Sequence, residues 1–301
     1  MVRKIAGDAC HLVRLTAQEW WRDDTFRYAS SVAFYTIFSM APVLLIAVGI
    51  ASLFLSRESA MERILAEVEQ LVGRQGTNAV EQILDASRGF GRGIWAIVTG
   101  GVTLLVGATA VFGELQAALN RIWDVHAVPR RGMLIKLLFD RLRSFAIALA
   151  VGFLLLVSLV VSAAISALQD YLNHWIPGMP WLWSSANIVV SLAAVTWLFA
   201  MIYKYLPDAR LTWKDVWVGA AVTAFLFTAG KFLIGVYLGR TAMASAFGAA
   251  GSFVVLLLWI YYSALICFFG AEFTQVFARF RGARIRPQTH AVRAGHKVMS
   301  H

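Results

Sequence analysis

The chain has 301 residues, of which 59% are hydrophobic and 15% are charged, and it carries a net charge of +10. Soluble domains contain about 25% charged residues, so this composition argues against a soluble globular protein. The two cysteines, Cys10 and Cys267, are too few for a disulfide framework or for a thiolate metal cluster within one chain.

The apolar residues occur in blocks that predict membrane-spanning helices. A bilayer core about 30 Å thick is crossed by about 20 apolar residues in a helix. Six segments meet this requirement: about 32–55, 94–117, 144–168, 184–206, 216–238 and 251–273. We therefore predict an all-α fold, a polytopic membrane helical bundle with six transmembrane helices over residues 30–278.

The distribution of positive charge predicts how this bundle is oriented. Of the 27 Lys and Arg residues, 20 lie before span one, between spans two and three, around the connection of spans four and five, or after span six. The other three connections together carry 6. Positive residues gather on the cytoplasmic side of a membrane, so both termini are expected in the cytoplasm.

The N-terminal part combines an interfacial segment with a proline-containing span. Residues 1–29 mix charges with Leu12, Trp20 and Phe26, which is typical of an amphipathic helix at the membrane interface. Pro42 lies inside span one, where it removes a backbone hydrogen bond and is expected to kink the helix. Such a kink fits a transport pathway, and it also fits ordinary helix packing.

The connection between spans one and two, residues 56–93, is long enough to have its own structure. Its first stretch opens with a capping-box pattern, Ser59 to Glu62. One helical face then carries Met61, Ile64, Leu65, Val68, Leu71 and Val72. A second helical stretch is ended by glycines. We expect the two stretches to form a small helical cap at the outer mouth of the bundle; the alternative is that they only lie at the membrane interface.

Span two ends in a carboxylate on a face of small residues. This face consists of Ala96, Gly100, Thr103, Gly107, Ala110, Glu114 and Ala117. Small residues mark helix–helix contacts in membranes. Glu114 is therefore expected to face protein and not lipid.

Span five carries Lys231 inside an apolar run. Six residues fall within an arc of about 100° at 3.6 residues per turn: Ala220, Ala224, Thr228, Lys231, Gly235 and Gly239. This small face predicts that Lys231 points inward, to a polar cavity or an ion pair, where it holds negative charge. The alternative is that Lys231 snorkels to the outer interface, about 8 Å away along the helix.

Span six carries Glu272 near its cytoplasmic end, at a depth similar to that of Glu114. Ionisable residues inside membrane spans are costly and often mark transport pathways. Two interpretations stay open for these glutamates: a role in a pathway, or a structural role in which each holds a basic residue at the inner edge. The expected partners are Arg27, Lys204 or Arg121.

The C-terminal residues 279–301 form a basic tail with few large apolar side chains. This composition is typical of a disordered segment. Contact with solvent or lipid headgroups explains its charge better than contact with nucleic acid. We therefore expect membrane lipids, and no nucleic acid, as partners.

The sequence contains none of the common catalytic or metal-binding motifs of water-soluble enzymes. The six histidines show no zinc-ligand spacing, and there is no phosphate-binding glycine loop or nucleophile elbow. No pair of acidic residues is placed to hold a metal for phosphodiester hydrolysis. We predict a protein that is not an enzyme and has no catalytic residues, metal or cofactor, while a lipid-modifying activity of Glu114 or Glu272 stays open.

Four stretches resemble a known family: "ASSVAFYTIFSMAPVLLIAV", "VFGELQAALNRIWDV", "YKYLPDARLTWKDVWVGAAVTAFLFTAGKFLIGVYLG" and "GSFVVLLLWIYYSALICFFGAEF". The chain resembles the YihY/BrkB family of bacterial inner-membrane proteins, also called virulence factor BrkB, over residues 20–282. The resemblance implies six helices, an inner-membrane location and no established biochemical activity. The matching positions are Pro42, Glu114, Asn120, Trp123, Pro207, Gly230, Lys231, Gly235, Tyr237, Gly270 and Glu272.

The family is also linked with serum resistance and with the movement of envelope lipids, and some members carry an older label, ribonuclease BN-like. The first hypothesis is a transporter or flippase for an envelope lipid or another anionic amphipathic compound. The second is a membrane scaffold that binds envelope-assembly proteins through the cap and the tail. If the protein is a transporter, its ionisable residues should face an accessible cavity. If it is a scaffold, they should be sealed in ion pairs. A metal-dependent ribonuclease would need acidic or histidine ligands that converge on the cytoplasmic face.

Overall fold

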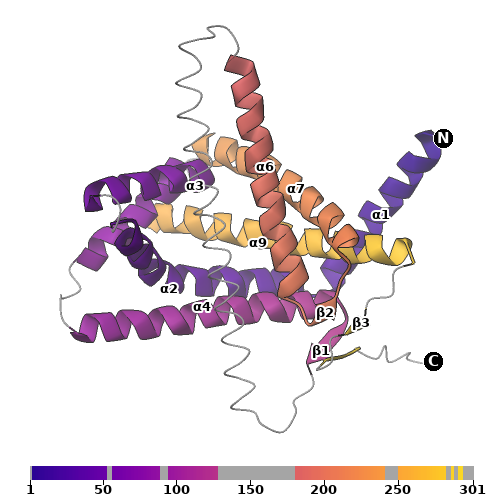
Figure 1. Cartoon of the computed structure of the whole chain (residues 1–301), viewed down its shortest axis with the longest axis horizontal. Coiled ribbons are helices and arrows are strands. Elements are labelled where there is room, and N and C mark those ends of the chain that lie inside the picture. The colour runs from indigo at the N-terminus through magenta and orange to yellow at the C-terminus, as the bar shows by residue number, and fades with distance from the viewer. Residues whose placement is uncertain are drawn as a thin grey trace. The chain divides into compact units, whose positions relative to one another are not determined.

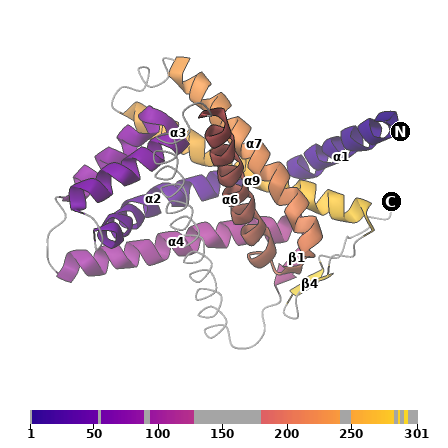
Figure 2. The ribbon, with the colours of Figure 1, turned by 45° about the horizontal axis from the view of Figure 1, so that its top comes forward.

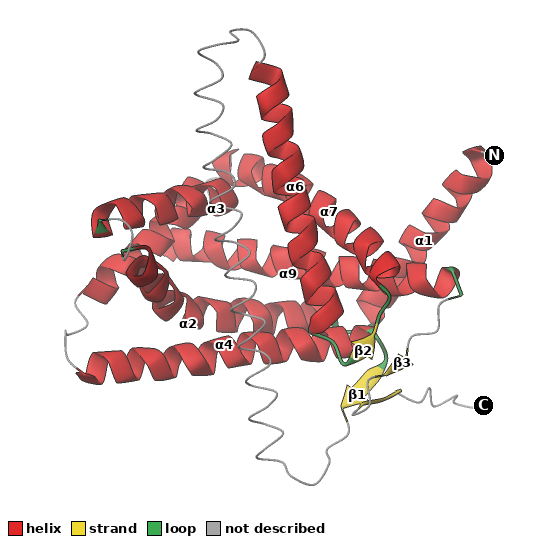
Figure 3. Cartoon of the chain, viewed as in Figure 1, coloured by secondary structure: helices red, strands yellow, loops and turns green. Residues whose placement is uncertain are grey.

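The computed structural model describes residues 2–52, 56–88, 94–127, 180–240, 250–282, 286–287 and 291–293. Figure 3 shows that these residues are almost entirely helical, which confirms the predicted helical character. Span three, predicted at 144–168, lies outside the described residues.

The helices cover the five predicted spans that fall within the described part of the chain. They are α1 (Val2–Arg22), α2 (Thr25–Ala51), α3 (Arg57–Arg88), α4 (Ile94–Ile122), α6 (Pro180–Tyr205), α7 (Trp213–Arg240) and α9 (Gly251–Phe280). By length and composition, α7 over Trp213–Leu233 and α9 over its whole length could cross a membrane. The six-span count, the side of the termini and the outer position of the cap stay predictions.

The chain divides into two compact units. Unit 1 is drawn from Met1–Asp23, Gln116–Leu226 and Cys267–His301, and unit 2 from Asp24–Leu115 and Phe227–Ile266. The divisions at 115/116, 226/227 and 266/267 fall inside α4, α7 and α9, so each of these helices contributes residues to both units.

Unit 2 has an apolar core made by α2, α3 and the first half of α9. Figures 1 and 2 both show α3 lying against α2. The buried core residues are Ala33, Val48, Val72, Ala79, Val80, Leu84, Leu256 and Ile260. Met61, Ile64, Leu65 and Val68 pack against this core. The apolar face predicted from the helical period of 56–93 is therefore the face that is covered.

α3 consists of two helical stretches, as the sequence predicts. The break is at Gly73, whose φ of 72° and ψ of 172° are accessible essentially only to glycine. The predicted capping box is wrong, however. Ser56 caps the helix, because the backbone N–H of Ser59 donates to Ser56 Oγ at 3.2 Å. Ser59 already lies in the first turn, so Glu62 is one turn further inside than a capping box requires.

In unit 1, α7 and α9 cross at two glycines. A Cβ at Gly219 would lie 2.7 Å from Thr274 Cβ, and a Cβ at Gly270 would lie 2.8 Å from Thr223 Cβ. Each threonine hydroxyl donates to the carbonyl of the glycine four residues earlier in its own helix, at 2.7 Å in both cases. The two sequences Gly219–Thr223 and Gly270–Thr274 therefore interlock, each threonine against the other helix's glycine.

The basic tail contributes two short strands, where disorder was expected. β3 (Arg286–Pro287) pairs antiparallel with β2 (Ala209–Arg210). β4 (Ala291–Arg293) pairs antiparallel with β1 (Val125–Ala127), with His126 opposite Val292. The composition of the tail indicates that it lacks side chains for a core. Strand pairing needs only unpaired backbone groups, and β1 and β2 offer them.

Candidate functional site

The second half of α9 carries a buried carboxyl group that has no hydrogen-bond partner among the described residues. Glu272 is fully buried, and neither of its carboxylate oxygens has a hydrogen-bond partner among the described residues. At 100° per residue, Glu272 lies on the side of α9 opposite Gly270 and Thr274. The crossing with α7 therefore covers one face of α9, and Glu272 is on the other.

Gln275 lies on the same face as Glu272, three residues further along α9. It is 1% exposed, and its side-chain oxygen also has no hydrogen-bond partner within the residues that the structure describes. Buried polar atoms in proteins are nearly always hydrogen-bonded. Three unpartnered oxygens on one turn of a helix are therefore an exception that needs a physical explanation.

The end of α1 packs beside this face of α9. The Trp20 ring meets Phe269 edge-on, with ring centroids 5.8 Å apart. The charged groups that act on Glu272 are Asp23, Glu19, Arg279 and Arg22. Two of them repel a carboxylate and two attract it, but none forms an ion pair with it in the described part of the chain.

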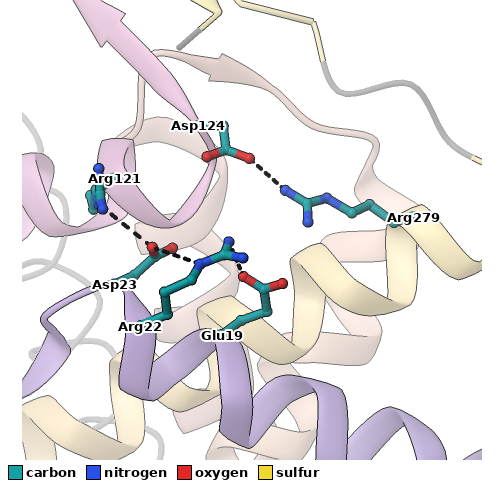
Figure 4. A network of polar contacts seen from close by, with 6 residues as sticks. All are labelled: Glu19, Arg22, Asp23, Arg121, Asp124 and Arg279. Carbon is teal, nitrogen blue, oxygen red and sulfur yellow. Dashed lines mark hydrogen bonds and ion pairs between the residues drawn. The ribbon is translucent and has the colours of Figure 1, made fainter. Parts of the chain in front are cut away.

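These charged groups belong to a network that we call the ion network: Glu19, Arg22, Asp23, Arg121, Asp124 and Arg279. Figure 4 shows its members converging from the ends of α1, α4 and α9. Arg121 Nε lies 3.5 Å from Asp23 Oδ1, and Arg22 Nε lies 3.8 Å from the same oxygen. Arg22 also pairs with Glu19, and Arg279 donates to Asp124 Oδ2 at 2.6 Å.

Local backbone geometry places the Asp124 carboxylate. Asp124 follows the end of α4 with a φ of 52°, the left-handed conformation in which helices commonly end. The chain thereby turns from α4 into β1, and Asp124 meets Arg279 from a part of the sequence 155 residues away.

Asp23 is the most enclosed acid of the ion network. Burial raises the pKa of its carboxyl above the ordinary value of 3.8, Arg121 and Arg22 oppose that rise, and Asp124 and Glu19 add to it. The arginines are about half exposed, with side-chain exposures of 46% and 52%. Solvent screens their charge, so burial has the larger effect.

A second polar contact joins α4 to the loop before β2. Asn120 donates its amide N–H to Asp208 Oδ2 at 2.9 Å, and its amide oxygen accepts the Asp208 backbone N–H at 2.8 Å. Gln116 donates to the same carboxylate at 3.3 Å. One matching position, Asn120, thus holds Asp208, the residue that follows the matching position Pro207, in a part-buried joint.

Glu114 and Lys231 belong to unit 2, and Glu272 belongs to unit 1. Both unit 2 residues are half-buried. In the chain as described, neither has a hydrogen bond or an ion pair. The glycine beside Lys231 is tightly packed, because a Cβ at Gly230 would lie 2.6 Å from the Tyr262 ring. The small face before Glu114 contacts α2, since a Cβ at Gly107 would lie 2.7 Å from Ser39 Cβ.

The basic residues expected as partners of the glutamates are engaged elsewhere. Arg121 pairs with Asp23. Lys204 donates to the Leu211 carbonyl and lies 5.5 Å from the Trp213 ring centroid. The Arg27 guanidinium lies over its neighbour Tyr28, 4.8 Å from the ring centroid. The structural interpretation, in which each glutamate holds a basic residue, does not describe Glu272.

The remaining matching positions are less informative. Trp123 is 2% exposed and closes the end of α4. α2 runs through Pro42 as one helix. The side chains of Pro42 and Tyr237 and the surroundings of Gly235 lie outside what the structure describes. Among the residues that are described, no group of three or more His, Cys, Asp or Glu could hold a metal ion.

Asp23, Asp208 and Gln275 were not predicted from the sequence. Asp208 stands in the stretch "YLPDARLTW", beside a matching position, and this neighbourhood was a usable signal. Asp23 and Gln275 have no such signal, because the local sequence pattern does not indicate which polar side chains become buried.

An exposed aromatic cluster lies at the junction of α6 and α7. The Trp197 ring is 6.3 Å from Trp213 and 5.5 Å from Trp217, and Tyr205 meets Trp213 at 6.1 Å. All four rings are 37–44% exposed. Exposed Trp and Tyr beside a lysine, here Lys204, are typical of the headgroup level of a membrane.

Comparisons with known proteins agree with the resemblance in the sequence. The family model described as virulence factor BrkB matches residues 16–295. A UPF0761 membrane protein of Neisseria meningitidis serogroup C is 28% identical over 261 residues, which cover 86% of this chain and 60% of the relative. A UPF0761 membrane protein of Alkalilimnicola ehrlichii is 27% identical, over 90% of this chain and 59% of the relative. Another, of Pseudomonas aeruginosa, is 28% identical, over 90% of this chain and 63% of the relative.

The chain spans about three fifths of the length of the first curated relatives it matches. No solved structure matches it. The family model nevertheless extends over most of the chain and includes α9, the ion network and the joint at Asp208. This chain is therefore a membrane protein that belongs to the virulence factor BrkB family.

Proposed function

We propose that the chain is an inner-membrane transporter or flippase that moves an envelope lipid, or another anionic amphipathic compound, without hydrolysing ATP itself. The observation that carries this proposal is the fully buried Glu272 of α9, a helix able to span a membrane. Its carboxylate oxygens have no hydrogen-bond partner among the described residues. Ionisable groups inside membrane helices are costly and mark substrate or ion pathways.

The scaffold hypothesis explains this carboxyl group less well. A scaffold only needs its buried acids to be held in ion pairs, as Asp23 is with Arg121 and Arg22. Glu272 is enclosed without such a pair, and nothing about partner binding accounts for the resulting cost. A protein that changes conformation does account for it, because a group that lacks a partner in one state can gain one in another.

The expected substrate class follows from charge and from the aromatic cluster. Lys231 is half-buried in α7 and without an ion pair among the described residues, so it can bind an anionic group. The aromatic cluster with Lys204 suits contact with the headgroups of a lipid layer. An anionic headgroup attached to an apolar tail meets both conditions.

The test measures how fast a labelled anionic lipid becomes accessible on the opposite face of vesicles. We would compare wild-type protein, Lys231→Met, Lys214→Met and protein-free vesicles. Lys214 is an exposed lysine of the same helix and serves as the matched control. We expect faster movement with wild type and Lys214→Met, and loss of that acceleration in Lys231→Met at equal folding. Equal rates in all four preparations would overturn the transport of that lipid.

A further inference from the structure

We propose that Glu272 binds and releases a proton during the working cycle, with Gln275 as the hydrogen-bond acceptor of the protonated state. This inference rests on the proposed transport function, and it names the proton gradient as the energy source of that transport.

Three side-chain oxygens on this face of α9 accept no hydrogen bond in the described part of the chain. Glu272 contributes two oxygens and Gln275 contributes one, and none of the three has a partner in the described residues. Residues three apart on a helix are neighbours. An ionised Glu272 therefore leaves a buried charge and unpaired acceptor oxygens on one turn of the helix, which is costly.

One bound proton resolves this arrangement. A proton taken from water forms an O–H bond on Glu272, and a protonated carboxyl group is a hydrogen-bond donor. The Glu272 O–H can then donate to Gln275 Oε1, so the same proton removes the charge and provides the missing donor. On release the O–H bond breaks, the electron pair stays on the carboxylate, and the proton returns to water.

A metal ion fits this place less well than a proton. Divalent cations bound through oxygen take about six ligands or more. The described surroundings offer no group of three acidic, histidine or cysteine residues. Glu272 and Gln275 are also at most 1% exposed, which leaves no room for a shell of water. A proton needs no further ligands.

The ion network provides the partner for the ionised state. Arg22 and Arg279 attract the Glu272 carboxylate, whereas Glu19 and Asp23 repel it. Both arginines are engaged in this conformation, Arg279 with Asp124 and Arg22 with Glu19 and Asp23. If the network opens, an arginine becomes available to the carboxylate. Glu272 would then alternate between a proton in the closed network and an arginine in the open one.

The first experiment detects the proton directly and does not depend on transport. Purified full-length protein in lipid vesicles is titrated with acid and base while infrared difference spectra record the carbonyl stretch of protonated carboxyl groups. We compare wild type with Glu272→Gln, which keeps the shape of the protonated acid, and with Glu114→Gln as the matched control. We expect one carboxyl band of the wild type to be lost in Glu272→Gln, kept in Glu114→Gln and shifted in Gln275→Leu.

The second experiment links the proton to transport. Lipid movement is measured in the same vesicles with and without a pH gradient, and with a sodium gradient at uniform pH. We expect the pH gradient to accelerate wild type and Glu62→Gln, a variant at an exposed glutamate of α3, several-fold. We expect it to leave Glu272→Gln unchanged. Acceleration by sodium alone would overturn the proton as the ligand.

The outcomes separate the two proposals. A titrating Glu272 band without lipid movement in any preparation would keep the proton site and overturn the transport function. Lipid movement that responds equally to the pH gradient in wild type and Glu272→Gln would keep transport and overturn the proton site. Infrared spectra that show no difference between wild type and Glu272→Gln over the whole titration would also overturn the proton site.

Discussion

Asp23, a member of the ion network, and Glu272, which the network surrounds, are both buried acids, but they differ in their ion-pair partners. Asp23 is 4% exposed and is held between Arg121 and Arg22. Glu272 is fully buried and lacks an ion pair in the described residues. Burial penalises a carboxylate in both places. The difference in partners is the reason why we assign the proton exchange of the proposed transport cycle to Glu272 and not to Asp23.

The raised pKa of Asp23 predicts a pH effect on stability. Burial, opposed by Arg121 and Arg22, makes the folded protein hold this proton at a higher pH than the unfolded chain does. Between the raised value and the ordinary value of 3.8, unfolding therefore releases a proton, and falling pH favours the folded state. We expect the Tm of wild type, relative to Asp23→Asn, to rise as the pH is lowered from neutral through this window.

Thermal unfolding in detergent at a series of pH values measures this difference. The comparison with Asp23→Asn cancels the other carboxyl groups, which titrate in both proteins. A difference that stays constant, or that moves in favour of Asp23→Asn as the pH falls, would contradict the raised pKa.

At the scale of elements, the crossing of α7 and α9 depends on having no side chain at two positions. Gly219 lies against Thr274, and Gly270 lies against Thr223 and the Tyr203 hydroxyl. Tyr203 in turn donates to the Cys267 carbonyl at 2.7 Å, so α6 is tied to the same place. Helices in membranes approach closely where small residues let their backbones meet, and here the hydroxyl groups of the threonines are already satisfied within their own helices.

The crossing predicts a strong effect of a single methyl group. A Cβ at Gly219 would lie 2.7 Å from Thr274 Cβ, and a Cβ at Gly270 would lie 2.7 Å from the Tyr203 hydroxyl. Overpacking of this kind costs about 1–3 kcal/mol. We expect Gly219→Ala and Gly270→Ala to lower the free energy of unfolding in detergent by that amount, as measured by denaturant titration.

Gly113 is the matched control for this prediction, because it lies in helix α4 and a methyl group added there would have nothing within 4 Å. Gly113→Ala is expected to be neutral or to stabilise by up to about 1 kcal/mol, since alanine favours helix more than glycine does. Equal effects of all three substitutions would show that helix propensity, and not the crossing, decides the outcome.

At the scale of the whole molecule, local patterns predicted the elements and not their long-range pairing. Apolar blocks indicated the helices, and the period of 56–93 identified the covered face of α3. The Asn120–Asp208 joint connects residues 88 positions apart, and no local pattern indicates such a pair. For the same reason Glu272 could be recognised as an unusual residue, while its actual neighbours in the ion network could not.

The orientation of the whole molecule is a separate prediction, made from charge alone. The excess of 20 Lys and Arg over 6 predicts both termini in the cytoplasm and residues 56–93 outside. A phosphatase reporter, which is active only outside the cytoplasm, is expected to be active when inserted within 56–93. The same reporter fused after residue 301 is expected to be inactive. The reverse pattern would contradict the orientation and with it the outer position of the cap.

The strands contributed by the tail have a consequence for the order in which unit 1 is completed. β1 and β2 are synthesised early, at residues 125–127 and 209–210, but their partners are β4 and β3, at residues 291–293 and 286–287. Domains generally fold as units while the chain is made from its N-terminus. Here the backbone groups of β1 and β2 remain unpaired until the segment after α9 has been synthesised. The helices of unit 1 can form as they are synthesised, but these two strand pairs can close only after α9 and the segment that follows it have been made.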